Sequence, residues 1–280
     1  MTASSIFPSS LYPLFAGGTS AFVTTILYQP LDFLKTQIQE PKDGVSKRSI
    51  LSVTKYTIRN YSTLRLWRGL TPSLFRAVPG SALYFHLLNL VKENISKSQQ
   101  TVLVNGICGA LARGAADLVV FPFTLIKARL ESSRYTTMSM MTVIQHVYTT
   151  YGLKGFYTGL LPTLARDLPF SGIYYMSYRK LKDTLEYETT VSSNQYWLTS
   201  QASISVAAGL IASFITQPAD VIKTYRQVAP IEYQNVYITI KSIFKKDGLS
   251  GFARGFFLRA FRRTLVAATA WTLYEFLLKQ

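Results

Sequence analysis

Residues 164–170, LARDLPF, place a cation beside an anion in a run, 160–178, that is otherwise apolar or uncharged. A guanidinium can hold both oxygens of a carboxylate, and a carboxylate can hold an ammonium group. Arg166 and Asp167 are adjacent, so on a helix their side chains point about 100° apart. They need not neutralise each other and can hold opposite ends of a zwitterionic ligand.

Arg166 has counterparts in two other parts of the chain. The seventh residue after each of three glycines is arginine: Arg76 follows Gly69, Arg166 follows Gly159 and Arg262 follows Gly255. At a rise of 1.5 Å per residue, each arginine lies about 10 Å into its helix. A charge facing lipid at that depth costs roughly 3 kcal/mol. We therefore expect all three arginines to face an internal cavity.

This spacing defines a candidate binding site for a small zwitterion. We expect Asp167 to bind the ammonium group and Arg76 or Arg262 to bind the carboxylate, while Arg166 assists the ligand or Asp167. The alternative is an ion-pair network that only keeps the cavity shaped and wet. Arg113 and Asp117, four residues apart, can pair with each other. Arg259 and Arg263 reach either lipid headgroups or the cavity mouth.

A second motif also occurs three times. It reads YQPLDFLKTQIQ at 28–39, VFPFTLIKARLE at 120–131 and TQPADVIKTYRQ at 216–227. Proline in a helix interior removes a backbone hydrogen bond and kinks the helix, so kinks are expected at Pro30, Pro122 and Pro218. Residues three apart share a helix face, which places the acid and the lysine of the motif together. Both motifs repeat every 90 to 96 residues, roughly, and this indicates a triplicated chain.

Each repeat contains two long apolar stretches, one before the proline motif and one after the glycine. Stretches of about 20 to 30 residues are long enough to cross a ~30 Å hydrocarbon core. We therefore predict an all-α membrane protein with six transmembrane helices in three pseudo-threefold repeats, 8–97, 101–186 and 195–280. Short amphipathic helices are expected between the long ones, at 48–60 and 236–248. A soluble helical solenoid is disfavoured, because its repeats would be shorter and less rich in glycine.

Composition agrees with a membrane protein. The 280 residues carry a net charge of +16, with 30 Lys and Arg against 14 Asp and Glu, and 48% are hydrophobic. In a soluble protein this balance would suggest nucleic acid, and in a membrane protein it suggests anionic lipid or substrate. One cysteine and two histidines make an internal disulfide impossible and a Cys/His zinc site improbable. With no phosphate-binding loop or nucleophile–base pair visible, we expect no enzyme activity, cofactor or metal.

The two motifs together resemble those of the mitochondrial carrier family. The resemblance rests on PLDFLK, PFTLIK and PADVIK, and on WRG, YTG and ARG further along each repeat. It implies a monomer in the mitochondrial inner membrane, with both termini facing the intermembrane space and cardiolipin bound at the matrix side. PFTLIKARLES and LARDLPFSGIYYMSY further resemble the members that carry glycine for haem synthesis.

The resemblance also implies a matrix gate of ion pairs between the proline motifs. Asp32 is expected to pair with Lys127, and Asp220 with Lys35. The third pair would join Thr124 to Lys223, but threonine carries no charge and can offer only a hydrogen bond. Gln39 and Gln227 are expected to brace the pairs from below. Glu131 takes that place in the second repeat and is expected to supply the missing anion to a nearby lysine.

A weaker gate is implied at the cytosolic side. Glu275 and Lys92 can form an ion pair there, and Asn89 can hydrogen-bond Lys182. Because the matrix gate is the stronger one, we expect the cytosol-open state to be favoured without substrate.

The function implied by the resemblance is import of glycine into the matrix, for 5-aminolevulinate and haem synthesis, by alternating access. The alternatives are a carrier of another small amino acid or amino-acid-like metabolite, an ion or proton leak protein, and a soluble nucleic-acid binder. Selectivity for glycine would come from excluding larger ligands. Five bulky residues near the arginines are candidates for this: Val78, Pro79, Leu83, Phe170 and Tyr174.

Overall fold

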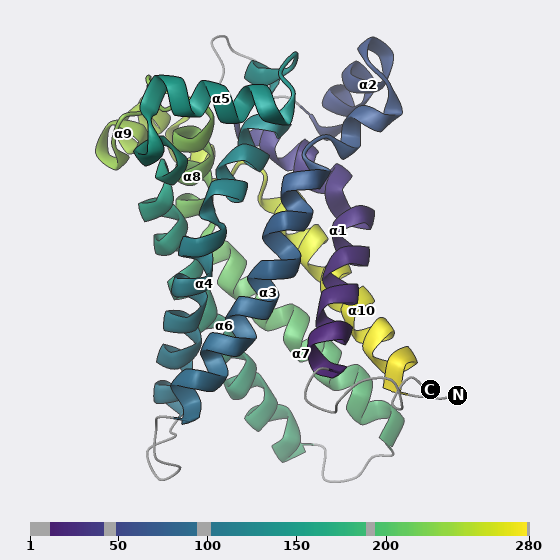
Figure 1. The fold of residues 1–280 in the computed structure, drawn as a ribbon. Helices are drawn as coiled ribbons and strands as arrows, with labels where there is room; N and C mark the ends of the chain where they lie inside the picture. Colours follow the sequence, from purple (N-terminus) through teal and green to yellow (C-terminus); the bar gives the residue numbers. More distant parts are fainter. Residues whose placement is uncertain (1–11, 42–48, 94–101, 189–193, 279–280) are drawn as a thin grey trace.

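The structure is a computed structural model that describes residues 12–41, 49–93, 102–188 and 194–278. Within these ranges the regular structure is entirely helical. Long helices form an upright bundle, and three short ones lie across the end opposite the chain termini (Figure 1). The long helices are α1 (Tyr12–Gln39), α3 (Leu70–Glu93), α4 (Val102–Glu131), α6 (Leu160–Glu188), α7 (Asn194–Ile215), which continues as α8 (Gln217–Val228), and α10 (Phe256–Leu278). The short ones are α2 (Ile50–Asn60), α5 (Met140–Tyr151) and α9 (Val236–Asp247).

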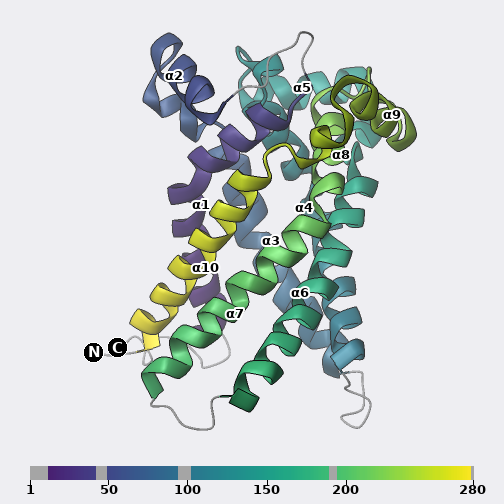
Figure 2. The ribbon, with the colours of Figure 1, turned by 180° about the vertical axis from the view of Figure 1, so that it is seen from behind.

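The long helices close into a ring. Contacts run from α1 to α3, then to α4, α6, α7 and α10, and α10 returns to α1 (Figures 1 and 2). The first and last repeats are therefore neighbours in space, as a threefold arrangement requires. The helices predicted at 48–60 and 236–248 are confirmed as α2 and α9. A further short helix, α5, occupies the equivalent place in the second repeat.

Each short helix is attached to its repeat by a small apolar cluster. Val53 of α2 packs with Phe33 and Leu34 of α1. In the next repeat, Val143 and Val147 of α5 pack in the same way against the last turns of α4. Ile243 of α9 packs in the third cluster, against α8. The same attachment in all three repeats fixes the short helices across one end of the ring.

The three motif prolines do not act alike. Pro30 and Pro122 lie inside continuous helices, α1 and α4. The third helix is interrupted instead: α7 ends at Ile215, α8 begins at Gln217, and their axes differ by 59°. Arg259 of α10 is buried against the break, where it donates to Thr216 Oγ1 at 2.7 Å and to Gln217 Oε1 at 3.2 Å. The expected kink at Pro218 is therefore a full break that an arginine stabilises.

Hydropathy alone identifies few of the long helices as membrane spans. Among the described residues, only Ile107–Glu131 is long and apolar enough by itself, and Ser203–Ile215 with Gln217–Val228 qualifies as a bent pair. The other long helices carry charged or polar residues within the ring, and these lower their mean hydropathy. The six spans therefore stay a prediction at this point.

The second long helix of each repeat, which we call an even helix (α3, α6 or α10), begins directly after a glycine whose backbone conformation disfavours other residues. Gly159 has φ +85° and Gly255 has φ +73°, in the left-handed region that favours glycine. A Cβ added at Gly255 would lie 2.9 Å from Cγ of Gln39, and one at Gly159 would lie 2.9 Å from Cγ of Gln227. These glutamines belong to the proline motifs of other repeats. The glycines therefore let each even helix start directly against a neighbouring repeat.

We predict that Gly255→Ala destabilises the protein by about 3 kcal/mol, because alanine adds backbone strain and a clash with Gln39. Gly248 is the matched control, since it has φ +63° but nothing within 4 Å of an added Cβ. Gly248→Ala should cost only about 1 kcal/mol, from the backbone alone. Thermal unfolding of the purified variants measures both. Equal losses would show that the contact with Gln39 has no cost.

Candidate functional site

The ring of helices encloses a cavity of about 810 Å³. At one end its lining reaches the proline-motif residues Glu131 and Gln227. At the other it reaches Leu88, near the end of α3, and Gly109, near the start of α4. Nine basic side chains line it: Lys35, Arg76, Arg113, Lys127, Arg166, Lys223, Arg259, Arg262 and Arg263. The acidic residues in the lining are Asp32, Glu131, Asp167 and Asp220. The cavity therefore has a large excess of positive charge.

Two ion pairs join the proline motifs at the inner end of the cavity. Lys127 Nζ of α4 lies 2.5 Å from Asp32 Oδ2 of α1, and Lys35 Nζ of α1 lies 2.6 Å from Asp220 Oδ2 of α8. Both pairs link helices of different repeats, and both predictions are confirmed. Gln39 Nε2 also donates to Asp220 Oδ2 at 3.0 Å, which confirms its predicted position as a brace.

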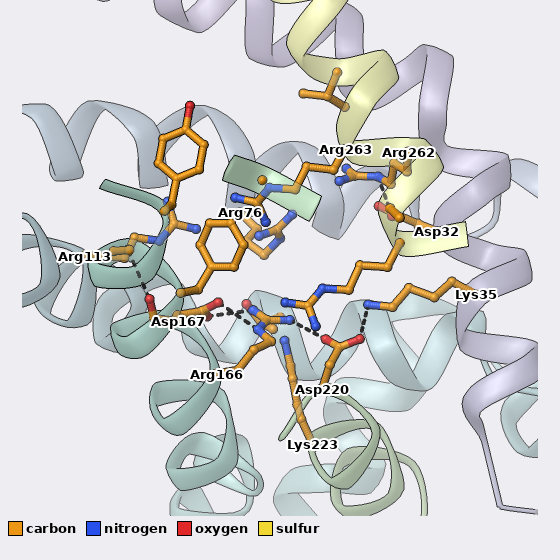
Figure 3. Close-up of a pocket in the computed structure, with 18 of the residues that line it drawn as sticks. Asp32, Lys35, Arg76, Arg113, Arg166, Asp167, Asp220, Lys223, Arg262 and Arg263 are labelled. Carbon is orange, nitrogen blue, oxygen red and sulfur yellow. Dashed lines mark hydrogen bonds and ion pairs between the residues drawn. The ribbon is translucent and has the colours of Figure 1, made fainter. Parts of the chain in front are cut away.

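Each of these aspartates also pairs with a second cation, an arginine of α6 or α10. Arg262 Nε of α10 lies 2.5 Å from Asp32 Oδ1, and Arg166 Nη1 of α6 donates to Asp220 Oδ1 at 2.8 Å (Figure 3). Asp32 is 9% exposed and Asp220 1%. Two buried carboxylates therefore join α1, α4, α6, α8 and α10, and two of the arginines predicted to bind the ligand pair with residues of the predicted gate.

The expected divergence of Arg166 and Asp167 is wrong for this conformation. Arg166 Nε donates to Asp167 Oδ1 at 2.7 Å, and Nη2 donates to Asp167 Oδ2 at 2.6 Å. The argument from helix angles failed because a guanidinium on a long side chain can curve back to its neighbour and still reach Asp220. Arg166 is therefore shared between two carboxylates, as the ion-pair-network alternative has it. A role in ligand binding stays a prediction for both residues.

Arg76 differs from Arg166 and Arg262, the other two arginines predicted to bind the ligand. Its side chain lines the cavity, and its Nε is buried without a hydrogen-bond partner. Within the described ranges it forms no ion pair. It is thus a cation available to a ligand carboxylate, as the prediction requires.

The remaining arginines of the cavity have separate roles. Arg113 pairs with Asp117 at 3.3 Å, as predicted, and only Arg113 lines the cavity. Arg263 lies over the ring of Phe170, with its guanidinium carbon 3.4 Å from the ring centroid. This contact was missed, because α6 and α10 are distant in sequence and no spacing rule connects them.

The third side of the gate has no ion pair. Thr124 donates only to Val120 of its own helix, at 3.4 Å. Lys223 is 8% exposed and has no ion-pair partner in the part of the chain that the structure describes (Figure 3). Glu131 does not reach it: this carboxylate lies 3.6 Å from Lys127, which Asp32 already holds, and accepts from Thr36 at 2.7 Å. The extra anion predicted for a nearby lysine is therefore present, and that lysine is Lys127, which also pairs with Asp32.

The predicted cytosolic gate is only partly covered by the structure. The side chains of Lys92 and Glu275 lie outside the described residues, so their pairing stays a prediction. Asn89 is exposed, and Lys182 is half-buried. Their hydrogen bond also stays a prediction.

The residues proposed to exclude large ligands divide into two groups. Phe170 and Tyr174 line the cavity and stack with ring centroids 6.1 Å apart. Val78, Pro79 and Leu83 are not part of its lining. The cavity is therefore expected to exclude large ligands through residues of α6 alone.

Arg68, the arginine of the WRG motif, makes its contacts within the protein. Its guanidinium donates to the carbonyl of Met138 at 2.7 Å and to those of Tyr135 and Thr136, in the next repeat. Burial and, secondarily, the nearby Arg65 lower the pKa of Arg68 to about 10. Arg68 remains charged at neutral pH and joins the first repeat to the second.

A ring of three helical repeats around one charged cavity, closed at one end by ion pairs, is the architecture of a membrane solute carrier. The family profile described as "Mitochondrial carrier protein" matches residues 8–99, 98–189 and 194–280. The chain belongs to this family, which makes it a transporter rather than an enzyme.

Similar proteins include mitochondrial glycine transporters of several vertebrates. The chain is 40% identical to that of Homo sapiens and to that of Ovis aries, over 92% of this chain and 86% of each relative. It is 39% identical to mitochondrial glycine transporter B of Danio rerio, over 95% of this chain and 94% of the relative.

We predict that Asp220→Asn lowers the free energy of unfolding by about 3–5 kcal/mol, because it leaves Lys35 and Arg166 buried without their shared anion. The matched control is Glu232→Gln, which removes the pair that Glu232 forms with Arg134 at 2.5 Å on the surface. An exposed pair of this kind contributes about 0–1 kcal/mol. Thermal unfolding of both variants tests the prediction, and similar small losses would contradict it.

Proposed function

We propose that this protein carries glycine across the mitochondrial inner membrane into the matrix, for 5-aminolevulinate and haem synthesis. The observation that carries the proposal is the identity of about 40%, over at least 92% of the chain, to relatives named mitochondrial glycine transporters. The cavity supports it, because it presents carboxylates and guanidinium groups together, as the two ends of a zwitterion require.

The substrate would bind through Arg76, Arg262, Arg166 and Asp167. Arg76 offers its guanidinium to the carboxylate without first losing a partner. Carboxylate oxygens accept several hydrogen bonds, so the glycine ammonium can approach Asp167 while Arg166 is still bound. The pairs that Arg166 and Arg262 make with Asp220 and Asp32 then compete with the substrate. Binding would thereby weaken the gate at two of its sides.

Transport by alternating access follows from this competition. In the proposed topology six helices span the membrane, the termini face the intermembrane space, and the ion pairs between proline motifs close the matrix side. Substrate entering from the intermembrane space would loosen these pairs and allow the matrix side to open. The conformation described here, with two ion pairs formed, is the state expected to receive substrate.

The size of the substrate would be limited from one wall of the cavity. Phe170 and Tyr174 stack along α6, and Arg263 of α10 covers the Phe170 ring. These three side chains occupy space beside Asp167 that a larger amino-acid side chain would need. A second small amino acid or amino-acid-like metabolite remains the alternative substrate, and competition for glycine uptake distinguishes the two.

Lipid binding and oligomeric state are also proposed from the family resemblance. The protein would function as a monomer, without nucleic acid, and would bind cardiolipin at its matrix side. Arg68 is occupied by backbone carbonyls, so the lipid phosphates would rely on other basic groups near that surface. Lys55, Lys154 and Lys241 are exposed there, on or beside the short helices.

We predict that the purified wild-type protein takes up labelled glycine into liposomes saturably, and that Asp167→Asn loses this uptake. The variant keeps the size of the side chain but removes the charge that binds the ammonium group. The control is Asp117→Asn, since Asp117 pairs with Arg113 but is not itself part of the cavity lining. Uptake by Asp167→Asn equal to that of wild type would make Asp167 structural. Conductance without saturable uptake would favour a leak protein.

We also predict that the cavity is accessible from the intermembrane-space side without substrate. Cys108 is the only cysteine, so Cys108→Ser gives a background for single-cysteine labelling. In that background, Ser205→Cys in the cavity lining should react with an impermeant maleimide added to the intermembrane-space side. Faster reaction from the matrix side would overturn the proposed resting state.

A further inference from the structure

The gate lacks an anion at one of three equivalent positions. The side between α1 and α8 has its anion, Asp220, and we call it the complete side. One oxygen of Asp220 accepts there from two residues of α1 that lie four positions apart. Lys35 Nζ is 2.6 Å and Gln39 Nε2 is 3.0 Å from Asp220 Oδ2. The lysine and the glutamine of the proline motif thus converge on a single carboxylate oxygen.

The equivalent donors on α8 have no such oxygen. By the repeat, Lys223 corresponds to Lys35, Gln227 to Gln39, and Thr124 of α4 to Asp220. Threonine supplies no carboxylate, and its hydroxyl is directed to Val120 of its own helix. The pair of donors is therefore preserved while its acceptor is missing.

The donors themselves indicate a ligand. Gln227 is 1% exposed, and its Nε2 is buried without a hydrogen-bond partner among the described residues. Lys223 is only 8% exposed, and it forms no ion pair with any residue that the structure describes. A buried donor without an acceptor is costly, and a buried cation without an anion is more so. A bound anion would remove both costs, because its oxygens accept hydrogen bonds and its charge pairs with the lysine.

The three side chains face one space. Thr124, Lys223 and Gln227 all line the cavity, although they come from two helices, α4 and α8. The cavity lining has nine basic residues against four acidic ones, so its charge also favours an anion at this point. Gly159 leaves the space that Gln227 Cγ occupies, since a Cβ added there would lie 2.9 Å from this atom.

We propose that Thr124, Lys223 and Gln227 form a binding site for one small anion of the carboxylate class, which completes the third side of the gate. One oxygen of the anion accepts from Lys223 Nζ and Gln227 Nε2, in the arrangement that Asp220 shows on the complete side. The Thr124 hydroxyl turns from Val120 to donate to the same group. The anion is a free monocarboxylate, distinct from the substrate carboxylate, which the proposed function assigns to Arg76.

The site makes the closed gate sensitive to anions. With the site filled, all three sides of the ring are held by a charge pair across neighbouring repeats. With the site empty, no ion pair joins α4 to α8 among the described residues, and a hydrogen bond from Arg129 Nε to the Gln227 carbonyl, at 3.3 Å, is among the contacts that remain. Occupancy therefore stabilises the conformation described here.

Thermal unfolding of the purified full-length protein in sodium acetate, at constant ionic strength, tests the site. The wild-type Tm should rise by about 3 °C or more between acetate-free and saturating conditions. Thr124→Asp places a covalent carboxylate in the site, so its Tm should be higher without acetate and should not respond to it. Thr124→Asn, of the same size but neutral, should keep the wild-type response.

An acetate response that is absent in wild type, or equal in all three proteins, overturns the proposal. A lower Tm for Thr124→Asp than for Thr124→Asn without acetate also overturns it. Glycine and glycine amide, which lacks the carboxylate, identify the source. A Tm rise with acetate assigns a free anion to the site, whereas a rise with glycine but with neither acetate nor glycine amide belongs to substrate binding at Arg76 and overturns the proposal.

Uptake of labelled glycine by the wild-type protein separates this inference from the proposed function. Saturable uptake without any anion-dependent Tm overturns the anion site alone. An acetate response that Thr124→Asp abolishes, in a protein that takes up no glycine, overturns the proposed function and supports the site.

Discussion

Two buried aspartates hold this molecule together, and each does so by binding two cations from different helices. Asp32 joins Lys127 and Arg262, while Asp220 joins Lys35 and Arg166. In a buried setting such pairs are strong only when each charge is fully matched. The lysines come from the gate and the arginines from the predicted binding layer. The residues predicted to recognise the substrate and those predicted to close the cavity therefore belong to one electrostatic network.

The glycines and glutamines of the repeats determine how closely this network can be assembled. Each even helix starts at a glycine that lies against the brace residue of another repeat: Gly69 at Glu131, Gly159 at Gln227 and Gly255 at Gln39. A side chain at any of these glycines would push the helix away from its neighbour. The charged residues could then no longer reach each other across the ring. These three glycines thus set how closely the charged residues of neighbouring repeats approach one another.

Sequence reasoning recovered the parts of the molecule that depend on spacing within a repeat. The three repeats, the short helices α2 and α9, and the pairs Asp32–Lys127 and Asp220–Lys35 follow from periodicity and from the family resemblance. It failed where a long side chain chooses among several partners. Arg166 turns to both Asp167 and Asp220, where helix angles had predicted that it diverges from Asp167. Rotamer choices of this kind depend on the whole cavity, and no local pattern encodes them.

The positive charge of the cavity has a consequence for the membrane that contains it. In the inner mitochondrial membrane, the location proposed above, a proton gradient stores energy, and a carrier that also conducted protons would dissipate it. Nine basic side chains against four acidic ones create an electrostatic barrier to hydronium and metal cations along the whole path. A neutral zwitterion can pass such a barrier because its own carboxylate compensates for its ammonium group. The arginines predicted to bind the substrate would thus also exclude free cations from the cavity.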